Sequence, residues 1–364
     1  MPSRGNASVP TLVITGDHEP PSIAGPEAVN AIEMRALRKV YKGSGKSRPA
    51  SGHSARFAPA GMSAPPVNDV VALESLDLDI RAGEFFGLLG PNGAGKTTAI
   101  GILTTRVLPT SGTAVVAGAD VVTNSVRVRQ TIGVVPQRPN ADLSLNVLEN
   151  LQFHAAYFGI NSDVATKRAH ELLDRLGLSS KASAKMSELS GGQQQRLMIV
   201  RALMHEPDII FLDEPTVGLD PQARLGLWEI LRDLHRRGRT IVMTTHYMDE
   251  ADRLCDRLAI IDHGKLLALD TPRALKSKAP GGTLIEMVLD GDATPTAEIA
   301  ETIDGITKVE ANDGQLRVHS DRGGQTLPAL IEAAESAGRT VTDIHLLQPS
   351  LETLFVSLTG RKLA

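Results

Sequence analysis

The chain has 364 residues, which allows two to three domains of ordinary size. A formal net charge of −4 and an aromatic content of 3% argue against nucleic acid as a partner, because nucleic-acid-binding proteins carry basic surfaces and stacking side chains. The single cysteine, Cys255, excludes an intrachain disulfide framework and a cysteine-built metal site. No apolar run approaches the roughly 18 residues of a membrane-spanning helix, so neither such a helix nor a signal peptide is expected.

Two segments near the N-terminus have a low-complexity composition. Residues 1–30 are rich in Pro, Gly, Ser and Ala and are interpreted as a disordered tail. A strand that includes Met34 and Tyr41 is expected next. Residues 43–67 are a second Pro-, Gly- and Ser-rich segment with basic residues and no acidic ones, which we interpret as a flexible insertion. A regulatory or phosphate-steering role for this insertion stays open.

From Val70 to about residue 270, short apolar runs alternate with longer helical patterns. This alternation predicts a largely parallel sheet flanked by helices. One helix has clear boundaries, because Asp220 can cap it, Pro221 suits its first position and Gly238 follows its last turn. The run Asp262-His-Gly-Lys265 predicts a tight hairpin turn. The core face of the bounded helix is predicted to consist of Leu225, Trp228, Leu231 and Leu234.

The pattern of apolar residues changes after Pro280, Gly281 and Gly282. Over residues 283–358 the order of predicted elements is β-α-β-β-α-β followed by a last helix, which indicates a small α+β domain of the ferredoxin-like kind. The predicted strands lie at 284–289, 308–310, 315–318 and 340–346, and the predicted helices at 297–303, 327–337 and 351–358. This domain is interpreted as a dimer-stabilising or regulatory module, with a passive appendage as the alternative.

A phosphate-binding loop is the first motif that carries chemistry. Residues 90–97 satisfy G-x-x-x-x-G-K-[ST], between an apolar strand at 85–89 and a helical pattern. Glycines let backbone amides converge on an anion, Lys96 reaches the β and γ phosphates, and the Thr97 hydroxyl ligates Mg²⁺. Residues 43–47 imitate the second half of this motif but lack its first glycine, so we interpret them as part of the insertion.

A pair of acidic residues ends a second apolar strand. The strand Ile209–Leu212 is followed by Asp213 and Glu214. An aspartate at this position can hold Mg²⁺ opposite Thr97, and the adjacent glutamate can orient and deprotonate an attacking water. Two acids at a strand end can also form a solvated turn, but the phosphate loop upstream favours the catalytic interpretation.

Further motifs complete a family resemblance that covers about residues 32–270. The segment Leu189-Ser-Gly-Gly-Gln193 resembles the signature sequence of ATP-binding cassette (ABC) ATPases. The other matches to this family are Gln137 for the Q-loop, Gly218-Leu-Asp-Pro221 for the D-loop, His246 for the switch histidine and Tyr41 for the adenine-stacking aromatic.

The resemblance implies an α/β fold: a P-loop NTPase ABC cassette over residues 31–270, with a mixed sheet, flanking helices and a helical subdomain at 138–188. It implies that two cassettes close head-to-tail over two ATP molecules, so that the signature of one contacts the γ-phosphate of the other. The implied catalytic residues are Lys96, Gln137, Glu214 and His246, and the implied Mg²⁺ ligands are Thr97, Gln137 and Asp213. The implied ATP-binding residues are Tyr41, Gly90, Pro91, Asn92, Gly93, Ala94, Gly95, Lys96, Thr97, Thr98, Ser190, Gly191, Gly192, Gln193 and Asp220.

Three short segments, one of them at the C-terminus, narrow the resemblance to one branch of the ABC family. Residues 348–360, 149–151 and 83–90 resemble daunorubicin-resistance-type exporter ATPases. The implied function is an ATP-hydrolysing subunit that drives efflux of a drug, lipid or polysaccharide, with the cargo recognised by a separate permease. Its implied partners are a second cassette, as a homodimer, and a separate polytopic membrane permease, at the cytoplasmic face of the cell membrane. The alternative is a soluble single-cassette ATPase that acts in assembly or signalling.

Overall fold

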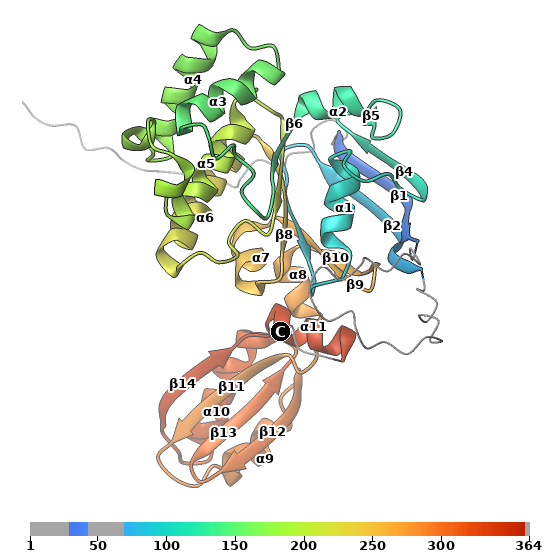
Figure 1. The fold of residues 1–364 in the computed structure, drawn as a ribbon. Helices are drawn as coiled ribbons and strands as arrows, with labels where there is room; N and C mark the ends of the chain where they lie inside the picture. Colours follow the sequence, from blue (N-terminus) through green and yellow to red (C-terminus); the bar gives the residue numbers. More distant parts are fainter. Residues whose placement is uncertain (1–28, 43–68, 361–364) are drawn as a thin grey trace, which may run out of the picture.

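The computed structural model describes residues 29–42 and 69–360 (Figure 1). Of the two low-complexity segments, residues 1–28 and 43–67 lie outside the described residues, and Asn30 already begins the first strand. The described residues form two sheets with surrounding helices, followed by a separate antiparallel sheet near the C-terminus.

The central sheet has six strands in the order β10-β9-β3-β8-β7-β6 and is parallel except for the β9–β10 hairpin. A second, antiparallel sheet has the order β2-β1-β4-β5. The strands of the central sheet are β3 (Phe85–Leu89), β6 (Ile132–Val135), β7 (Ile209–Asp213), β8 (Thr240–Thr245), β9 (Arg257–Asp262) and β10 (Lys265–Asp270). Those of the second sheet are β1 (Asn30–Tyr41), β2 (Val70–Arg81), β4 (Ser111–Val116) and β5 (Ala119–Asp120).

Helices cover both faces of the central sheet. The helices of this part of the chain are α1 (Lys96–Leu103), α2 (Ser125–Thr131), α3 (Val147–Tyr157), α4 (Ser162–Arg175), α5 (Gly191–Leu203), α6 (Pro221–Arg236), α7 (Met248–Leu254) and α8 (Pro272–Ser277), with short 3₁₀ turns at Ser179–Lys181 and Met186–Glu188. Helix α1 shares one apolar core with the second sheet and one face of the central sheet, whereas α3 to α8 share the core on the other face.

Strand β3 shows why short apolar runs predicted this sheet. All five of its residues are buried, because it lies between β8 and β9 with a core on each face. Successive side chains of a strand point to opposite faces. Accordingly, Phe85 and Leu89 lie in the core with α3 to α8, and Phe86 and Leu88 lie in the core with α1. A strand buried on both faces reads as a continuous apolar run rather than an alternating one.

Helix α6 has the predicted boundaries and a partly different core face. The Asp220 side chain accepts a hydrogen bond from the Ala223 amide at 2.9 Å, and Pro221 occupies the first turn. Leu225, predicted to face the core, is exposed, and Leu227 is buried instead. The reason is geometric: residues spaced by three drift around a helix of 3.6 residues per turn, so the first member of the series leaves the buried face.

The C-terminal region forms the third sheet, in the order β12-β13-β11-β14 with every neighbouring pair antiparallel. Its elements are β11 (Thr283–Leu289), α9 (Thr294–Ala300), β12 (Ile306–Asn312), β13 (Gln315–Ser320), a 3₁₀ turn at Gly323–Thr326, α10 (Leu327–Ser336), β14 (Val341–Leu347) and α11 (Leu351–Thr359). The first and third strands are central, which is the ferredoxin-like layout expected from the β-α-β-β-α-β order. Ala300 of α9 and Leu330 of α10 share a small separate core with the sheet.

Helix α11 ends the chain's described part but does not pack on the C-terminal sheet. Leu351, Leu354 and Phe355 are buried in the large core of the N-terminal part, and α11 contacts α7 and α8 (Figure 1). Ser350 caps the helix by accepting from the Thr353 amide at 3.1 Å, and Gly360 ends it in a left-handed conformation. The last helix therefore joins the C-terminal domain to the sheet that carries the phosphate loop.

If α11 is part of this core, Phe355→Ala should destabilise the N-terminal part by about 3–5 kcal/mol, because it leaves a large cavity at a site with no exposed surface. Denaturant unfolding followed by Trp228 fluorescence measures the loss. Leu358→Ala on the same helix is the control, since Leu358 is exposed and its removal should change stability little. Equal effects of the two substitutions would contradict the packing.

Candidate functional site

The phosphate loop connects β3 to α1, and its glycines are fixed by crowding and by backbone conformation. A Cβ atom on Gly90 would lie 2.1 Å from the Ile261 carbonyl oxygen, so no other residue fits there without a shift of β9. Gly95 has φ +107°, and a Cβ atom would lie 2.4 Å from the Ala72 carbonyl oxygen. The loop therefore wraps closely against neighbouring strands and leads directly into the N-terminus of α1.

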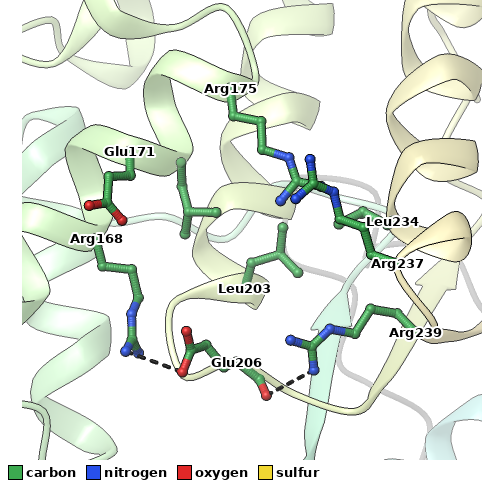
Figure 2. Close-up of a pocket in the computed structure, with 9 residues that line it drawn as sticks. Arg168, Glu171, Arg175, Leu203, Glu206, Leu234, Arg237 and Arg239 are labelled. Carbon is green, nitrogen blue, oxygen red and sulfur yellow. Dashed lines mark hydrogen bonds and ion pairs between the residues drawn. The ribbon is translucent and has the colours of Figure 1, made fainter.

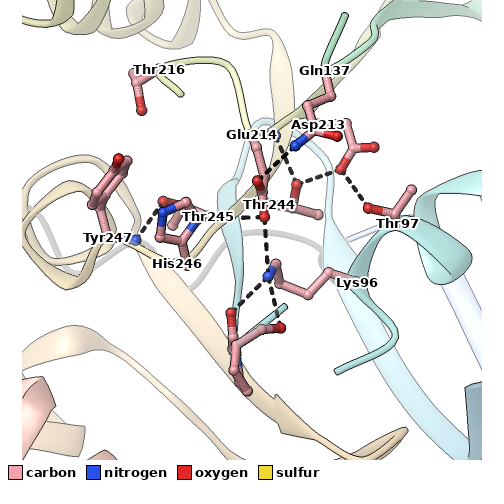
Figure 3. A network of polar contacts seen from close by, with 12 residues as sticks. Lys96, Thr97, Gln137, Asp213, Glu214, Thr216, Thr244, Thr245, His246 and Tyr247 are labelled. Carbon is pink, nitrogen blue, oxygen red and sulfur yellow. Dashed lines mark hydrogen bonds and ion pairs between the residues drawn. The ribbon is translucent and has the colours of Figure 1, made fainter. Parts of the chain in front are cut away.

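Lys96 is the first residue of α1 and is buried beneath the loop. Its Nζ atom donates to the carbonyl oxygens of Gly90 at 2.7 Å and Pro91 at 3.1 Å and lies 3.2 Å from Oε1 of Glu214 (Figure 3). Burial lowers the pKa of the Lys96 ammonium group, and the nearby Glu214 and Asp213 carboxylates oppose that shift. The lysine is thus a buried cation whose partners lie at the mouth of the loop.

Asp213, at the end of β7, lies between two threonine hydroxyls. Its Oδ1 atom accepts from Thr97 Oγ1 at 3.2 Å and from Thr244 Oγ1 at 2.7 Å (Figure 3). Thr244 also accepts from the Glu214 amide at 2.9 Å, so it bridges β8 to both acidic residues. The acid pair is buried rather than solvated, which excludes the solvated-turn alternative.

Glu214 follows directly and has a strained backbone, with φ +47°. Its two carboxylate oxygens have different partners. Oε2 accepts from Gln137 Nε2 at 3.0 Å, whereas Oε1 lies 3.2 Å from Lys96 Nζ and 3.5 Å from His246 Nδ1 (Figure 3). The His246 Nδ1 atom is buried and makes no hydrogen bond with the described residues. Side chains from three other segments therefore converge on this one carboxylate.

A cleft of about 340 Å³ opens in front of these groups. It is lined by Tyr41, Val70, Val71, Ala72, residues 91–98, Gln137 and Glu214. The long insertion does not remove Tyr41 from it, because Tyr41 and Val70 are paired neighbours on β1 and β2. Tyr41 is 42% exposed, with Lys39 Nζ 5.0 Å from the centre of its ring.

The residues of the signature and of the D-loop lie outside this cleft. None of the residues that line this cleft comes from 190–193 or includes Asp220. Ser190 caps α5 by accepting from the Gln193 amide at 3.3 Å, while Gln193 Oε1 accepts from the Ser190 amide at 2.9 Å. Ser190 and Gly191 are exposed, as is Asp220. Within the described part of one chain, the predicted site is therefore divided into two separate surfaces.

Comparison with known proteins agrees with this arrangement. The family described as ABC transporter matches residues 73–217. Nod factor export ATP-binding protein I of Burkholderia lata is 40% identical over 300 residues, which cover 81% of this chain and 94% of that protein. The chain belongs to the ABC transporter ATP-binding family. As a member of this family it binds and hydrolyses ATP.

Other relatives extend the comparison. Nod factor export ATP-binding protein I of a Rhizobium species is 39% identical, with coverage of 81% of this chain and 94% of that protein. A solved ATP-binding cassette, described as a dimer in a post-hydrolysis state bound to ADP and Pi, has a TM-score of 0.55 and 28% identity; it covers 66% of this chain and 98% of its own. A solved ATP-binding subunit of an ABC transporter has a TM-score of 0.55 and 26% identity, with coverage of 68% and 92%. The predicted ABC cassette fold is thereby confirmed as a fold class.

A larger groove, of about 490 Å³, lies between α4, α5 and α6 (Figure 2). Arg168 pairs with Glu206 at 3.2 Å, and Arg175 and Arg237 share the carboxylate of Asp233. The arginines are thus paired with acidic residues of neighbouring elements. This groove joins the helical layer to the central sheet and contains none of the predicted site residues.

Sequence reasoning missed Thr244, although a polar residue near the end of an otherwise apolar strand was a usable signal. Thr244→Val should cost about 1–3 kcal/mol of stability, because it removes the hydroxyl donor to the buried Asp213 carboxylate and one of the two acceptors of the Glu214 amide, the other being the Thr244 carbonyl oxygen. Thr244→Ser keeps the hydroxyl and should restore most of the loss. Thermal unfolding of the two variants measures this, and equal stability of both would contradict the bridging role.

Proposed function

We propose that this chain is the ATP-hydrolysing subunit of an ABC exporter that works as a head-to-tail dimer with a separate membrane permease. The observation that carries the catalytic part is the convergence of Lys96, Gln137 and His246 on Glu214. These residues come from four segments that are distant in sequence, and they meet at the mouth of the phosphate loop. The roles below are assigned on this geometry and on the family resemblance.

ATP binding is proposed to use the cleft of about 340 Å³. Lys96 is a buried cation that is now satisfied by two carbonyls and a carboxylate, and a nucleotide's β and γ phosphates would provide stronger anionic partners. The backbone amides of residues 92–97 are proposed to surround the phosphates at the N-terminus of α1. Tyr41 stacks on the adenine at the other end of the cleft.

A Mg²⁺ ion fits the donors that face this cleft. Thr97 Oγ1 and Asp213 Oδ1 lie 3.2 Å apart, and the described residues contain no cluster of three or more acidic, His or Cys residues that could hold a metal without the nucleotide. Mg²⁺ needs only one or two protein oxygens when phosphates and waters complete its shell. Thr97 and Asp213, with Gln137 beside them, would hold the ion, which neutralises phosphate charge.

In the hydrolytic step, Glu214 is proposed to orient the attacking water and accept its proton. Its strained backbone and its three polar neighbours hold the carboxylate in one orientation. His246, with its Nδ1 atom unbonded and buried beside Glu214, is proposed to hold the γ-phosphate and the water in line. Gln137 links this geometry to the segment that leads into the helical layer.

Dimerisation is proposed to complete each site. Ser190, Gly191, Gly192 and Gln193 lie at an exposed helix N-terminus, where orphan amides favour an anion. A second chain would present this surface to the γ-phosphate bound in the first, and Asp220 would lie at the same contact. The solved relative described as a dimer bound to ADP and Pi supports this arrangement.

Export is supported by the relatives, which are Nod factor export ATP-binding proteins, and by the resemblance to daunorubicin-resistance-type exporters. Within residues 29–42 and 69–360, no helix is long and apolar enough to cross a membrane. We propose that a separate polytopic permease carries the cargo, which is a drug, lipid or polysaccharide. This subunit is proposed to bind the permease from the cytoplasmic face of the membrane.

The permease is proposed to dock in a third groove, of about 260 Å³, between the central sheet and α3. Its apolar members include Ile132, Val134 and Phe158, and Phe158 stacks on His205 at 3.8 Å. The described lining contains arginines and histidines but no carboxylate. Burial lowers the pKa of His154 to about 4, helped by Arg201 and His205, so this histidine is neutral at pH 7. The lining residues are Thr104, Arg106, Arg129, Ile132, Val134, Pro136, Asn140, His154, Phe158, Arg201 and His205.

Glu214→Gln should lower the turnover number for ATP at least about 100-fold while ATP binding persists, because the amide cannot accept the proton of water. Steady-state phosphate release and equilibrium nucleotide binding measure the two effects separately. Glu229→Gln, an exposed position on α6, is the matched control and should leave turnover unchanged. Unchanged hydrolysis in Glu214→Gln would remove the residue from its proposed role.

Arg106→Glu should reduce recovery of a polytopic partner when the tagged subunit is purified from its native membranes in mild detergent. Arg106 is exposed on the docking groove, so the reversal changes its charge without breaking the core. Arg81→Glu, exposed but outside the groove, is the control. ATP turnover of the detached subunit should be the same for both. Recovery of soluble partners alone with the unaltered protein would instead support an assembly or signalling ATPase.

A further inference from the structure

A buried carboxylate lies behind the site and has no role in the mechanism above. Glu250, in the first turn of α7, has no exposed surface. Its Oε2 atom accepts from Thr216 Oγ1 at 3.2 Å and its Oε1 atom accepts from Trp228 Nε1 at 3.0 Å. The hydroxyl of Thr245 also donates to this carboxylate. One side chain therefore joins four elements of the structure.

Two of these donors adjoin residues of the site. Thr216 follows Glu214 by two positions, in the segment that leads to Asp220, and Thr245 directly precedes His246. Figure 3 shows Thr216 and Thr245 in the segments that follow β7 and end β8. Glu250 thus ties the segment after Glu214 to the segment that carries His246.

The turn that holds His246 is fixed on its other side as well. Thr245 Oγ1 accepts from the Tyr247 amide at 2.9 Å, so one hydroxyl both closes the turn and contacts Glu250. The rings of His246 and Tyr247 are 4.2 Å apart, and the Arg224 guanidinium lies 4.4 Å from the Tyr247 ring centre. The positive charge of Arg224, on α6, lowers the pKa of Glu250 and so favours its carboxylate form.

A carboxylate at this buried position costs free energy, because burial disfavours its charged form. Burial raises the pKa of Glu250, and the donated bonds from Thr245, Trp228 and Thr216 only partly oppose the shift. A carboxylate accepts from several donors at once on two oxygens, whereas a glutamine amide has only one accepting oxygen. What the ionised side chain adds is therefore simultaneous attachment to three donors from three segments.

We propose that Glu250 is a positioning residue that holds the turn carrying His246 in register with Glu214. It acts through the Thr245 hydroxyl on one side and the Thr216 hydroxyl on the other. This inference rests on the proposed hydrolytic roles of Glu214 and His246. It adds that the register between their segments is set behind the site, by a side chain that does not touch the nucleotide.

The test is a set of steady-state ATPase measurements with thermal unfolding of the same samples. Glu250→Gln should lower the turnover number about ten- to a hundredfold, while the KM for ATP stays within about twofold of that of the unaltered protein. Thermal stability should not fall, because removal of a buried charge offsets the lost hydrogen bond. A purely structural residue would instead lower the melting temperature and leave the turnover per folded molecule unchanged. Glu84→Gln, which breaks a buried pair with Arg257 remote from the cleft, is the control expected to behave in that second way.

A second pair of variants keeps the inference testable if Glu250→Gln does not fold. Thr216→Val removes one donor to Glu250 and should lower turnover about tenfold at unchanged KM, and Thr216→Ser should restore it. Normal turnover in both Glu250→Gln and Thr216→Val would overturn the inference. Failure of the proposed function has a different signature, since Glu214→Gln would then still hydrolyse ATP.

Discussion

The contact between Lys96 and Glu214 is the constraint around which this site is built. Both side chains are more than 90% buried, and the cost of removing two charges from water is recovered only through close pairing and further hydrogen bonds. The lysine has two loop carbonyls as extra acceptors, and the glutamate has Gln137 as an extra donor. Each charge therefore fixes a different segment, and the pair holds the phosphate loop against the end of β7. In the proposed mechanism, an arriving triphosphate would compete for the lysine and free the carboxylate to act on water.

Much of this arrangement could be predicted because it depends on residues that are close in sequence. The loop at residues 90–97 and the acid pair follow the apolar strands β3 and β7, and the carboxyl ends of all parallel strands of a sheet lie at the same edge. The hairpin at Asp262–Lys265 also follows from local turn chemistry, since His263 and Gly264 both have positive φ. These features are set by local sequence and by one rule of sheet topology.

The features that could not be predicted depend on contacts between distant segments. Thr244 bridges the acid pair only because β8 lies beside β7, and Tyr41 reaches the cleft only because β1 pairs with β2 across the long insertion. Leu225 was assigned to the core from spacing alone, although the orientation of α6 on the sheet decides which face is buried. Helix α11 follows the C-terminal domain in sequence and packs in the core of the cassette, which no periodicity reveals.

The packing of α11 has a consequence for how the two parts of the chain influence each other. Helix α7 begins two residues after His246, carries Glu250 in its first turn, and contacts α11 and α8 on its other side. A displacement of β14 would therefore reach α7 through residues 348–350 and α11, which packs against α7. Because packed interiors transmit strain rather than absorb it, the C-terminal domain is mechanically connected to the proposed hydrolytic site through one short helix. This connection favours a regulatory module over a passive appendage, since an appendage would need only a flexible linker.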